Sequence, residues 1–404
     1  MKKFLKIVGV ILILLLFVAC LSRKKIYRLN FALKMFSGVE MVDRFRTVED
    51  YFPTRIIEPN TTPSTFARNS QEIKLPETYE YRGKSKSTQQ LMDITDATGL
   101  LVIKNDTIQF EEYYRGNTED SHTIAWSVTK SFVSALMGIA IEEGVVASID
   151  DTVIQYVPEL EGSAYENITI KNLLQMSSGV RWNEDYGDFN SDINRFGRTL
   201  ALGSSFESFV QSLGTAREQG TYCLYNSMDT QVLGMIISRA SGMTLSDYLE
   251  TKIWKPIGME NKAWWVVDDV GDEFAAAGLN ASLRDYARFG KLYLNKGTFN
   301  GESIVPSDWV EKSLTPDAPH LMPGKRSFGY GYQWWIPNSE QGEFMAVGVY
   351  NQFIYVNPAE NVIIVKSSAY SSYGSGDQYD TYSDHETLTL FRKIVDGLKT
   401  SKSI

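Results

Sequence analysis

The sequence predicts an α+β fold, in which strands from both ends of the body form one sheet around a mainly helical inserted region. Strand-like segments lie near residues 100–111 and again at 330–367, whereas residues from about 145 to 325 alternate between helix-like segments and loops. Strands and helices segregated in this way are typical of the α+β class. The 404 residues suit one large domain or two ordinary ones.

The early strands form a predicted hairpin. Leu100–Ile103 and Ile108–Glu111 flank the turn-forming pair Asn105-Asp106. Near the other end, four segments combine β-branched and aromatic residues, and a proline-containing turn at 357–361 separates the last two. These late strands are expected at Tyr330–Ile336, Glu343–Val347, Gln352–Val356 and Val362–Ser367.

Helices are predicted where apolar residues recur every three or four positions. One helix begins at Ser127, carries Val128, Phe132 and Leu136 on one face, and stops near Gly144. Ser282 is positioned to cap another helix. The remaining helices are expected at Ile168–Met176, Thr230–Ala240, Leu245–Ile253, Leu283–Leu294 and Glu386–Leu398.

The N-terminus resembles an export or anchoring signal. A short basic head precedes 15 uncharged residues from Ile7 to Leu21, fewer than the roughly 18–20 that span a bilayer comfortably. Val18-Ala19-Cys20 resembles the end of a bacterial lipoprotein signal, in which Cys20 would be lipidated. An uncleaved signal anchor and a cytoplasmic protein stay open as alternatives, because the basic residues after the apolar run resist export.

These features divide the chain into three parts. We expect a signal peptide or membrane anchor over residues 1–21, a stalk or wrapping segment over 22–80, and a folded body over 81–404 with its helical insert at about 145–325. The expected location is the cell envelope, with the body outside the cytoplasm and the membrane contacted through the N-terminus.

Composition excludes several classes of protein. Apolar residues make up 43% of the chain and charged residues 22%, which is ordinary for a globular protein and not for a disordered one. Cys20 and Cys223 are the only cysteines, too few for a disulfide scaffold or a cysteine zinc site. Residues 1–39 carry eight basic and no acidic residues, so the remainder has a net charge of −17 and is not expected to bind nucleic acid.

The segment from Trp126 to Phe132 contains the strongest chemical signal. Ser127 and Lys130 are three residues apart, so they share one face at the start of the predicted helix. A serine hydroxyl needs an adjacent base to become a good nucleophile, and a lysine can be that base once burial lowers its pKa. The pattern alone is weak, because Ser22 and Lys25 show it within a merely basic flank.

In its context, however, this segment resembles the beta-lactamase-like serine hydrolases, which include penicillin-binding proteins, class C-type esterases and 6-aminohexanoate-dimer hydrolases. The resemblance extends over most of residues 95–398, including Leu173–Val180, Gly278–Ala281 with Arg284-Asp285, and Gly301–Trp309. It implies a beta-lactamase/transpeptidase-like fold: an antiparallel sheet with helices on both faces.

The resemblance also assigns residues to the family's second and third motifs. Tyr225 matches the tyrosine that relays protons, and Ser227 replaces the usual asparagine of that motif as a substrate-binding residue. In the third motif Gly348 is kept but its Lys or His is missing, which counts against penicillin turnover. The backbone N–H groups of Val349 and Ser127 would form the oxyanion hole.

The aromatic and histidine residues give weaker indications of function. Tyr186 lies in a polar loop expected near the cleft and is a candidate substrate contact, although packing in the core or sheet is the more common role for any one aromatic residue. No Gly-x-Ser-x-Gly motif is present, which excludes the usual α/β-hydrolase signature. The three scattered histidines do not suggest a zinc hydrolase.

The sequence thus predicts a serine hydrolase that cleaves a small-molecule or peptide amide or ester through an acyl-enzyme on Ser127. Lys130 and Tyr225 would transfer the protons, and neither a metal nor another cofactor is expected. The alternative is a non-catalytic penicillin-binding or cell-wall sensor protein that acylates without turnover.

Overall fold

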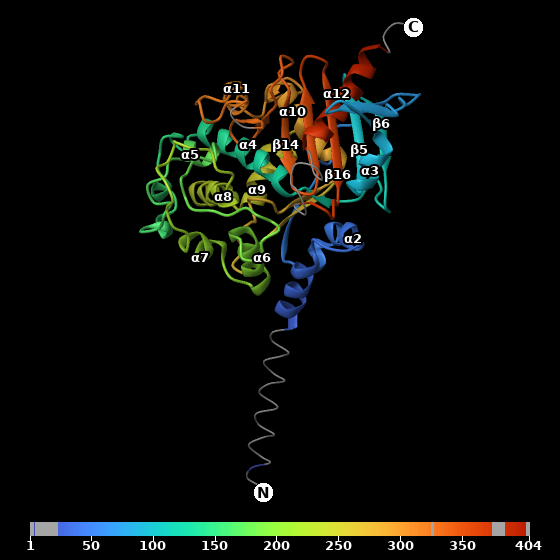
Figure 1. Ribbon diagram of the computed structural model, residues 1–404. Helices are drawn as coiled ribbons and strands as arrows, with labels where there is room; N and C mark the ends of the chain where they lie inside the picture. Colours follow the sequence, from blue (N-terminus) through green and yellow to red (C-terminus); the bar gives the residue numbers. More distant parts are fainter. Residues whose placement is uncertain (1–3, 5–22, 325–326, 374–383, 401–404) are drawn as a thin grey trace.

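Both ends of the body contribute strands to one eight-stranded sheet (Figure 1). The computed structural model describes residues 4, 23–324, 327–373 and 384–400. The sheet is antiparallel except for the two-residue strand β2, which pairs parallel to β6. In sheet order its strands are β12 (Gly329–Tyr330), β13 (Trp335–Ile336), β14 (Phe344–Gly348), β15 (Gln352–Asn357), β16 (Val362–Ser368), β5 (Ala97–Lys104), β6 (Thr107–Tyr113) and β2 (Ala67–Arg68).

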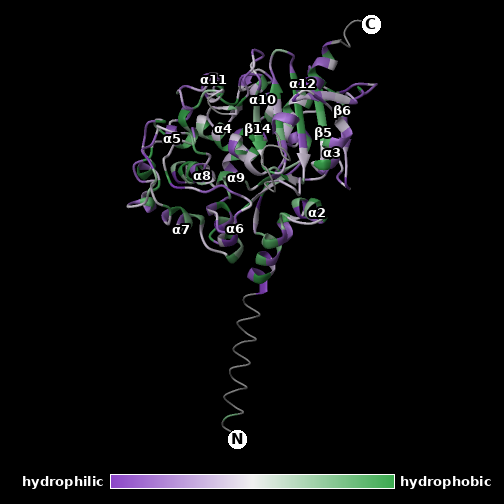
Figure 2. Ribbon diagram, viewed as in Figure 1, coloured by the Kyte–Doolittle hydropathy of each residue, from purple (hydrophilic) through white to green (hydrophobic). Residues whose placement is uncertain are grey.

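Helices cover both faces of this sheet, as the resemblance to the beta-lactamase-like hydrolases implies. On one face α10 (Leu283–Leu294) packs so closely that a Cβ atom at Gly290 would lie 2.9 Å from Ile354. On the other face α12 (Asp384–Thr400) places Phe391 with its ring centroid 5.5 Å from that of Tyr355. Ile354 and Tyr355 are neighbours in β15, so their side chains point to opposite faces. Figure 2 shows the strands between these helices mostly in green, because both faces are buried.

The region between β6 and β12 is mainly helical, and its longest helices confirm the sequence pattern. The helix α10 has the predicted bounds, and its Ser282 cap accepts a hydrogen bond from the backbone N–H of Asp285. Two further helices, α6 and α7, are each capped by a serine and were not predicted from the sequence. Besides α10, the described helices here are α4 (Thr129–Glu142), α5 (Ile170–Leu174), α6 (Asp192–Leu202), α7 (Phe206–Gln211), α8 (Ser227–Ser241), α9 (Leu245–Leu249) and α11 (Ser307–Ser313).

Two of the expected elements differ in the structure. The strand expected at 330–336 is interrupted between β12 and β13, because Gln333 has a φ of +63° and its side-chain amide donates to the Leu173 and Leu174 carbonyls. The helix expected at 245–253 leaves α geometry after Leu249 and continues as a π-helical turn, η5 (Glu250–Trp254).

A second sheet, which was not predicted from the sequence, joins a strand of the N-terminal segment to strands of the body. Its order is β1 (Thr54–Ile57), β8 (Ala263–Val266), β9 (Leu279–Ala281) and β7 (Thr123–Ile124). Smaller hairpins form from β3 (Thr78–Tyr81) with β4 (Lys84–Ser87), which precede α3 (Thr88–Ile94), and from β10 (Thr298–Phe299) with β11 (Glu302–Ser303). Since β7 leads directly into the segment that carries Ser127, this sheet helps to fix that residue.

The segment over residues 22–80 packs against the body along much of its length. Residues 23–34 are helical, α2 spans Met41–Arg46, and Phe31, Met35, Phe45 and Phe52 are buried in the main core. Arg28 forms an ion pair of 2.5 Å with Asp269. Among the described residues no helix is both long and apolar enough to cross a membrane. Cys20 and most of residues 1–21 lie outside the described residues.

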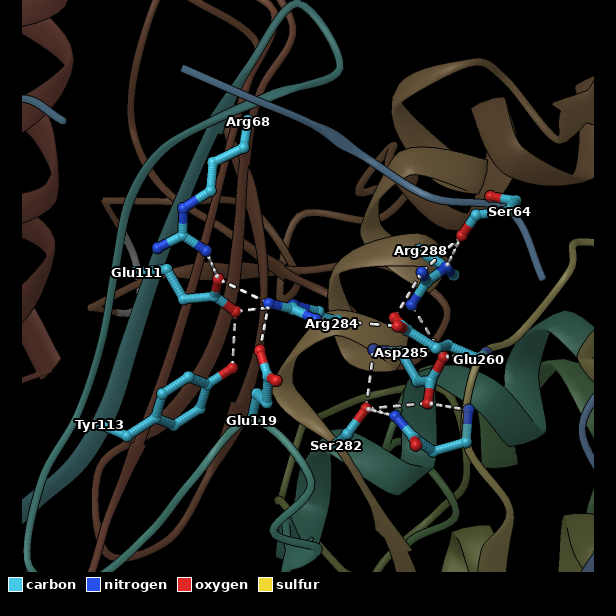
Figure 3. A network of polar contacts seen from close by, with 11 residues as sticks. Ser64, Arg68, Glu111, Tyr113, Glu119, Glu260, Ser282, Arg284, Asp285 and Arg288 are labelled. Atoms are coloured by element: carbon cyan, nitrogen blue, oxygen red, sulfur yellow. Dashed lines mark hydrogen bonds and ion pairs between the residues drawn. The ribbon is translucent and has the colours of Figure 1, made fainter. Parts of the chain in front are cut away.

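A polar network joins β6 to the start of α10 (Figure 3). Arg284 donates two hydrogen bonds of 2.8 and 2.9 Å to the buried carboxylate of Glu111, which also accepts from Arg68 and Tyr113. Next to it, the buried Asp285 accepts from Arg288 at 3.0 Å and from the Ser282 hydroxyl at 2.8 Å. The network holds α10 in place against the large sheet.

Candidate active site

Ser127 lies on a strained turn at the start of α4. It is the middle residue of the 3₁₀ turn η2 (Trp126–Val128), and Trp126 immediately before it has a φ of +49°. A non-glycine residue in this left-handed region costs free energy and persists only where the surroundings enforce it. Here the rings of Phe45 and Tyr350 pack against Trp126, with centroid distances of 5.1 and 6.0 Å. The turn therefore presents Ser127 in one fixed orientation.

Lys130 contacts Ser127 from the first turn of the same helix. Its Nζ donates to Ser127 Oγ at 2.9 Å and to the Ala276 carbonyl at 2.7 Å. The side chain is fully buried, and this burial lowers the pKa of Lys130 to about 8, although the charge of Glu184 acts in the opposite direction. A lysine with a pKa near neutrality can take up the serine proton, as a general base must.

Tyr225 completes the group. Lys130 Nζ lies 5.2 Å from the centroid of the Tyr225 ring, which places this ring beside the Ser127–Lys130 pair. Burial, with the charge of Glu184, raises the pKa of Tyr225 well above its usual value, so the phenol is neutral and holds its proton. Its ring stacks on Trp335 with a centroid distance of 5.4 Å. The structure thus brings together Ser127, Lys130 and Tyr225.

Strand β14 approaches the serine turn so closely that only glycine fits at its end. A Cβ atom at Gly348 would lie 2.2 Å from the carbonyl oxygen of Ala125, two residues before the serine. Val349 follows and lines the same cavity as Ser127. Gly348 therefore lets the backbone around Val349 come close to the turn that carries Ser127.

Glu184 is a site residue that the sequence analysis did not identify. Its carboxylate accepts from the Ser227 hydroxyl at 2.6 Å and from the Tyr186 hydroxyl at 2.7 Å, and Trp182 Nε1 also donates to it. The backbone N–H of Ser227, the first residue of α8, donates as well, at 3.1 Å. The only available signal was the polar loop in which Tyr186 was expected. Ser227 and Tyr186 both line the cavity beside Ser127.

The cavity next to Ser127 has a volume of about 320 Å³. The three histidines are not among its lining residues, and His122 instead donates from Nε2 to the Lys262 carbonyl and packs on Trp264. Across the described part of the chain, His, Cys, Asp and Glu side chains form no group of three or more that could hold a metal ion.

The sequence matches one known protein family over most of the folded body. The family model described as Beta-lactamase matches residues 85–389, about three quarters of the chain. The chain belongs to the beta-lactamase family. The resemblance inferred from the sequence motifs is thereby confirmed, and so is the fold class.

Individual relatives place the chain within this family. It is 29% identical over 298 residues to the 6-aminohexanoate-dimer hydrolase of Paenarthrobacter ureafaciens, covering 70% of this chain and 75% of that protein. A structure of a Bacillus anthracis protein assigned as a 6-aminohexanoate-dimer hydrolase superposes with a TM-score of 0.80 at 24% identity, covering 91% of this chain and 96% of the other. A class C beta-lactamase gives a TM-score of 0.56 at 18% identity, covering 77% and 94%.

The Bacillus anthracis structure also bears on the N-terminal segment. The 91% coverage exceeds the share of this chain from residue 85 onward, so the shared fold includes part of the segment before the family match begins. That segment supplies Phe45, which packs on Trp126 next to Ser127.

Proposed function

We propose that this beta-lactamase-family hydrolase cleaves an ester or amide through an acyl-enzyme on Ser127. The observation that carries the proposal is the hydrogen bond of 2.9 Å from the buried Lys130 amine to Ser127 Oγ. A deprotonated Lys130 would accept the proton from Ser127, and Oγ would form a bond to the substrate carbonyl carbon. The resulting oxyanion would be stabilised by the backbone N–H groups of Ser127 and Val349.

Collapse of this intermediate breaks the bond to the leaving group. The departing alcohol or amine takes a proton from Tyr225, which the protonated Lys130 replenishes. A water molecule then attacks the acyl-enzyme and gives one proton to the same pair of groups. The pair passes a proton to Ser127 Oγ as its bond to the acyl carbon breaks, which releases the carboxylic acid and restores Ser127. The neutral phenol of Tyr225, whose ring lies beside the Lys130 amine, supports its role as the proton donor.

The amide activity in the name of the Paenarthrobacter relative supports the inclusion of amides in this substrate class. The test compares the native protein with Ser127→Ala, using an acylating active-site probe and an activated ester. We expect labelling at Ser127 and product in excess of enzyme from the native protein, and neither from the variant. Full labelling of Ser127→Ala would overturn the proposal, and a stable penicillin adduct without any ester turnover would favour the sensor function.

We also propose that the N-terminus anchors the protein in a membrane, with the body outside the cytoplasm. Support comes from the basic head, the apolar run from Ile7 to Leu21, and Cys20 at its end. Fractionation of a bacterial host that expresses the full chain tests this. Membrane association that Cys20→Ser abolishes indicates lipidation, association that persists indicates an uncleaved anchor, and a native protein found in the cytosol contradicts both.

A further inference from the structure

The cavity beside Ser127 extends away from the catalytic groups, between the N-terminal segment and α6. Met35, Phe36 and Phe52 line it from the N-terminal side, and Ile193, Phe196 and Leu200 from α6. Ser127 and Val349 line the same cavity. This space is therefore enclosed by two elements that the sequence analysis did not associate with the site.

The walls of the cavity are mostly apolar, and two of its polar members, Asn194 and Arg198, donate to the backbone carbonyls of Tyr186 and Phe189. Met35, Phe52, Phe196 and Phe274 are each less than a tenth exposed and line it with hydrocarbon surface. A polar group moved into such surroundings loses its hydration without gaining hydrogen bonds, which costs several kcal/mol by transfer measurements. A hydrocarbon chain gains free energy there with each methylene group that leaves water. The chemistry of the walls therefore selects an alkyl chain.

The position of the catalytic groups indicates which half of the substrate occupies the cavity. Ser127 and Val349 line it, whereas Lys130 and Tyr225 do not belong to its lining residues. The leaving group must be near Tyr225 to receive its proton, so it lies on the other side of the carbonyl carbon. The cavity is then on the acyl side.

The volume of the cavity limits the length of the chain. A water molecule takes up about 30 Å³ in the liquid, and a methylene group is of similar size. A cavity of about 320 Å³ consequently has room for a chain of about eight to ten carbons. Leu33 and Phe189 also line the cavity while 55% and 61% exposed, so it reaches the surface between the N-terminal helix and α6.

The geometry points to a medium-chain acyl ester as the substrate class, with its acyl chain in the cavity between residues 32–37 and α6. This inference rests on the proposed acyl-enzyme mechanism, and it adds the specificity of the acyl side.

A series of p-nitrophenyl esters from acetate to tetradecanoate, each kept below its aggregation concentration, tests the inference on the full chain. We expect kcat/KM to rise by about fourfold per added methylene up to eight to ten carbons and then to level off. A rate that is flat or falls beyond butyrate would overturn the inference. So would a chain-length dependence found with alkyl acetates, in which the alcohol varies, but not with the acyl series.

Gly197 offers a substitution that fills the cavity without strain. It lines the cavity from within α6, and a Cβ atom there would meet no atom within 4 Å. Replacing a helical glycine also favours the helix. Gly197→Phe should lower the ratio of decanoate to acetate kcat/KM by at least tenfold. The matched control is Gly397→Phe, another helical glycine with open space around its Cβ position but in α12, which should keep the native ratio.

The outcomes separate this inference from the proposed function. If acetate is hydrolysed through Ser127 but the ratio is unaffected by Gly197→Phe, the acyl cavity is wrong and the mechanism stands. If the protein hydrolyses no ester and takes up no acylating probe at Ser127, the proposed function fails, and the acyl cavity fails with it.

Discussion

The amine of Lys130 lies 2.9 Å from the hydroxyl oxygen of Ser127, one helical turn away and fully buried. Neither residue can move far, because Ala276 accepts a second hydrogen bond from the amine and the turn around Trp126 fixes the serine. Burial lowers the pKa of Lys130 to about 8. The proposed base and nucleophile are therefore already paired before a substrate binds.

The pH dependence of hydrolysis should follow Lys130. Only its neutral form can accept the proton of Ser127, and that form becomes abundant as the pH rises through about 8. We expect kcat/KM for a neutral ester to increase with pH and to level off above this value. Lys130→Met should reduce kcat/KM by about 10²- to 10⁴-fold and abolish its rise with pH. A profile that falls over the same range would contradict the role of Lys130.

Glu184 should set the pH at which kcat/KM rises. Its negative charge raises the pKa of Lys130 against the larger effect of burial. Glu184→Gln removes the charge while keeping a similar shape, so the pKa of Lys130 should fall and the rise in kcat/KM should begin at lower pH. The matched control is Asp185→Asn, an exposed neighbour whose carboxylate caps Gly187, and it should leave the midpoint unchanged. A shift to higher pH in Glu184→Gln would rule out this electrostatic effect.

Tyr225 should matter most for substrates with poor leaving groups. An alkoxide needs a proton as it departs, whereas p-nitrophenolate does not. Tyr225→Phe should therefore lower kcat by about 10²-fold or more for an alkyl ester, within the usual range for general acid catalysis, and by much less for the p-nitrophenyl ester with the same acyl group. Tyr222→Phe, at a tyrosine that is 51% exposed, is the control. Equal losses for both leaving groups would assign Tyr225 to positioning alone.

A methyl group at Gly348 should disturb the site. Its carbon would lie 2.2 Å from the Ala125 carbonyl oxygen, so β14 must move away from the serine turn. Displacements of about 1 Å in an active site can cost 10²-fold in rate, and overpacking costs about 1–3 kcal/mol of stability. Gly348→Ala should show both losses in kcat/KM and in thermal unfolding. Gly197→Ala, where the Cβ has open space, should fold at least as stably as the native chain.

The Asp285–Arg288 pair should contribute to folding rather than to catalysis. Both side chains are almost completely buried, 3.0 Å apart, at the start of α10. Without Asp285, Arg288 keeps its ion pair with Glu260, but the backbone N–H groups of Glu260 and Asn261 lose their carboxylate acceptor. Removing one partner of a buried charged network typically costs about 3–5 kcal/mol. Asp285→Ala should lower the free energy of unfolding by this amount in urea titrations. Asp308→Ala, which breaks the exposed pair with Lys312, should change it by less than about 1 kcal/mol.

Local signals made some elements predictable from the sequence. The helix from Leu283 has a serine cap and a regular apolar stripe, and its predicted bounds match the structure. The strand 330–336 failed for a tertiary reason, because Gln333 leaves extended geometry to bond the distant Leu173 and Leu174 carbonyls. No local pattern encodes such a contact.

In the site, too, only the contacts between residues close in sequence could be predicted. Ser127 and Lys130 are three residues apart, so their pairing follows from helix geometry alone. Glu184 and Ser227 meet only because the loop after Trp182 folds onto the start of α8, 43 residues further along the chain. Likewise, Phe36 and Phe45 contact Tyr350 from a segment expected to be a stalk or wrapping segment, with centroid distances of 5.0 and 5.5 Å. Both contacts join residues far apart in the sequence, so no local pattern predicts them.

The central claim is that Ser127 carries the acyl group. Its most direct test is mass spectrometry of peptides from the native protein, quenched in acid during turnover of p-nitrophenyl decanoate. The account predicts a decanoyl adduct on the Ser127 peptide that appears with an initial burst of p-nitrophenol and disappears when the ester is consumed. Sustained turnover with the decanoyl group on a different residue, or by Ser127→Ala at the native rate, would contradict it.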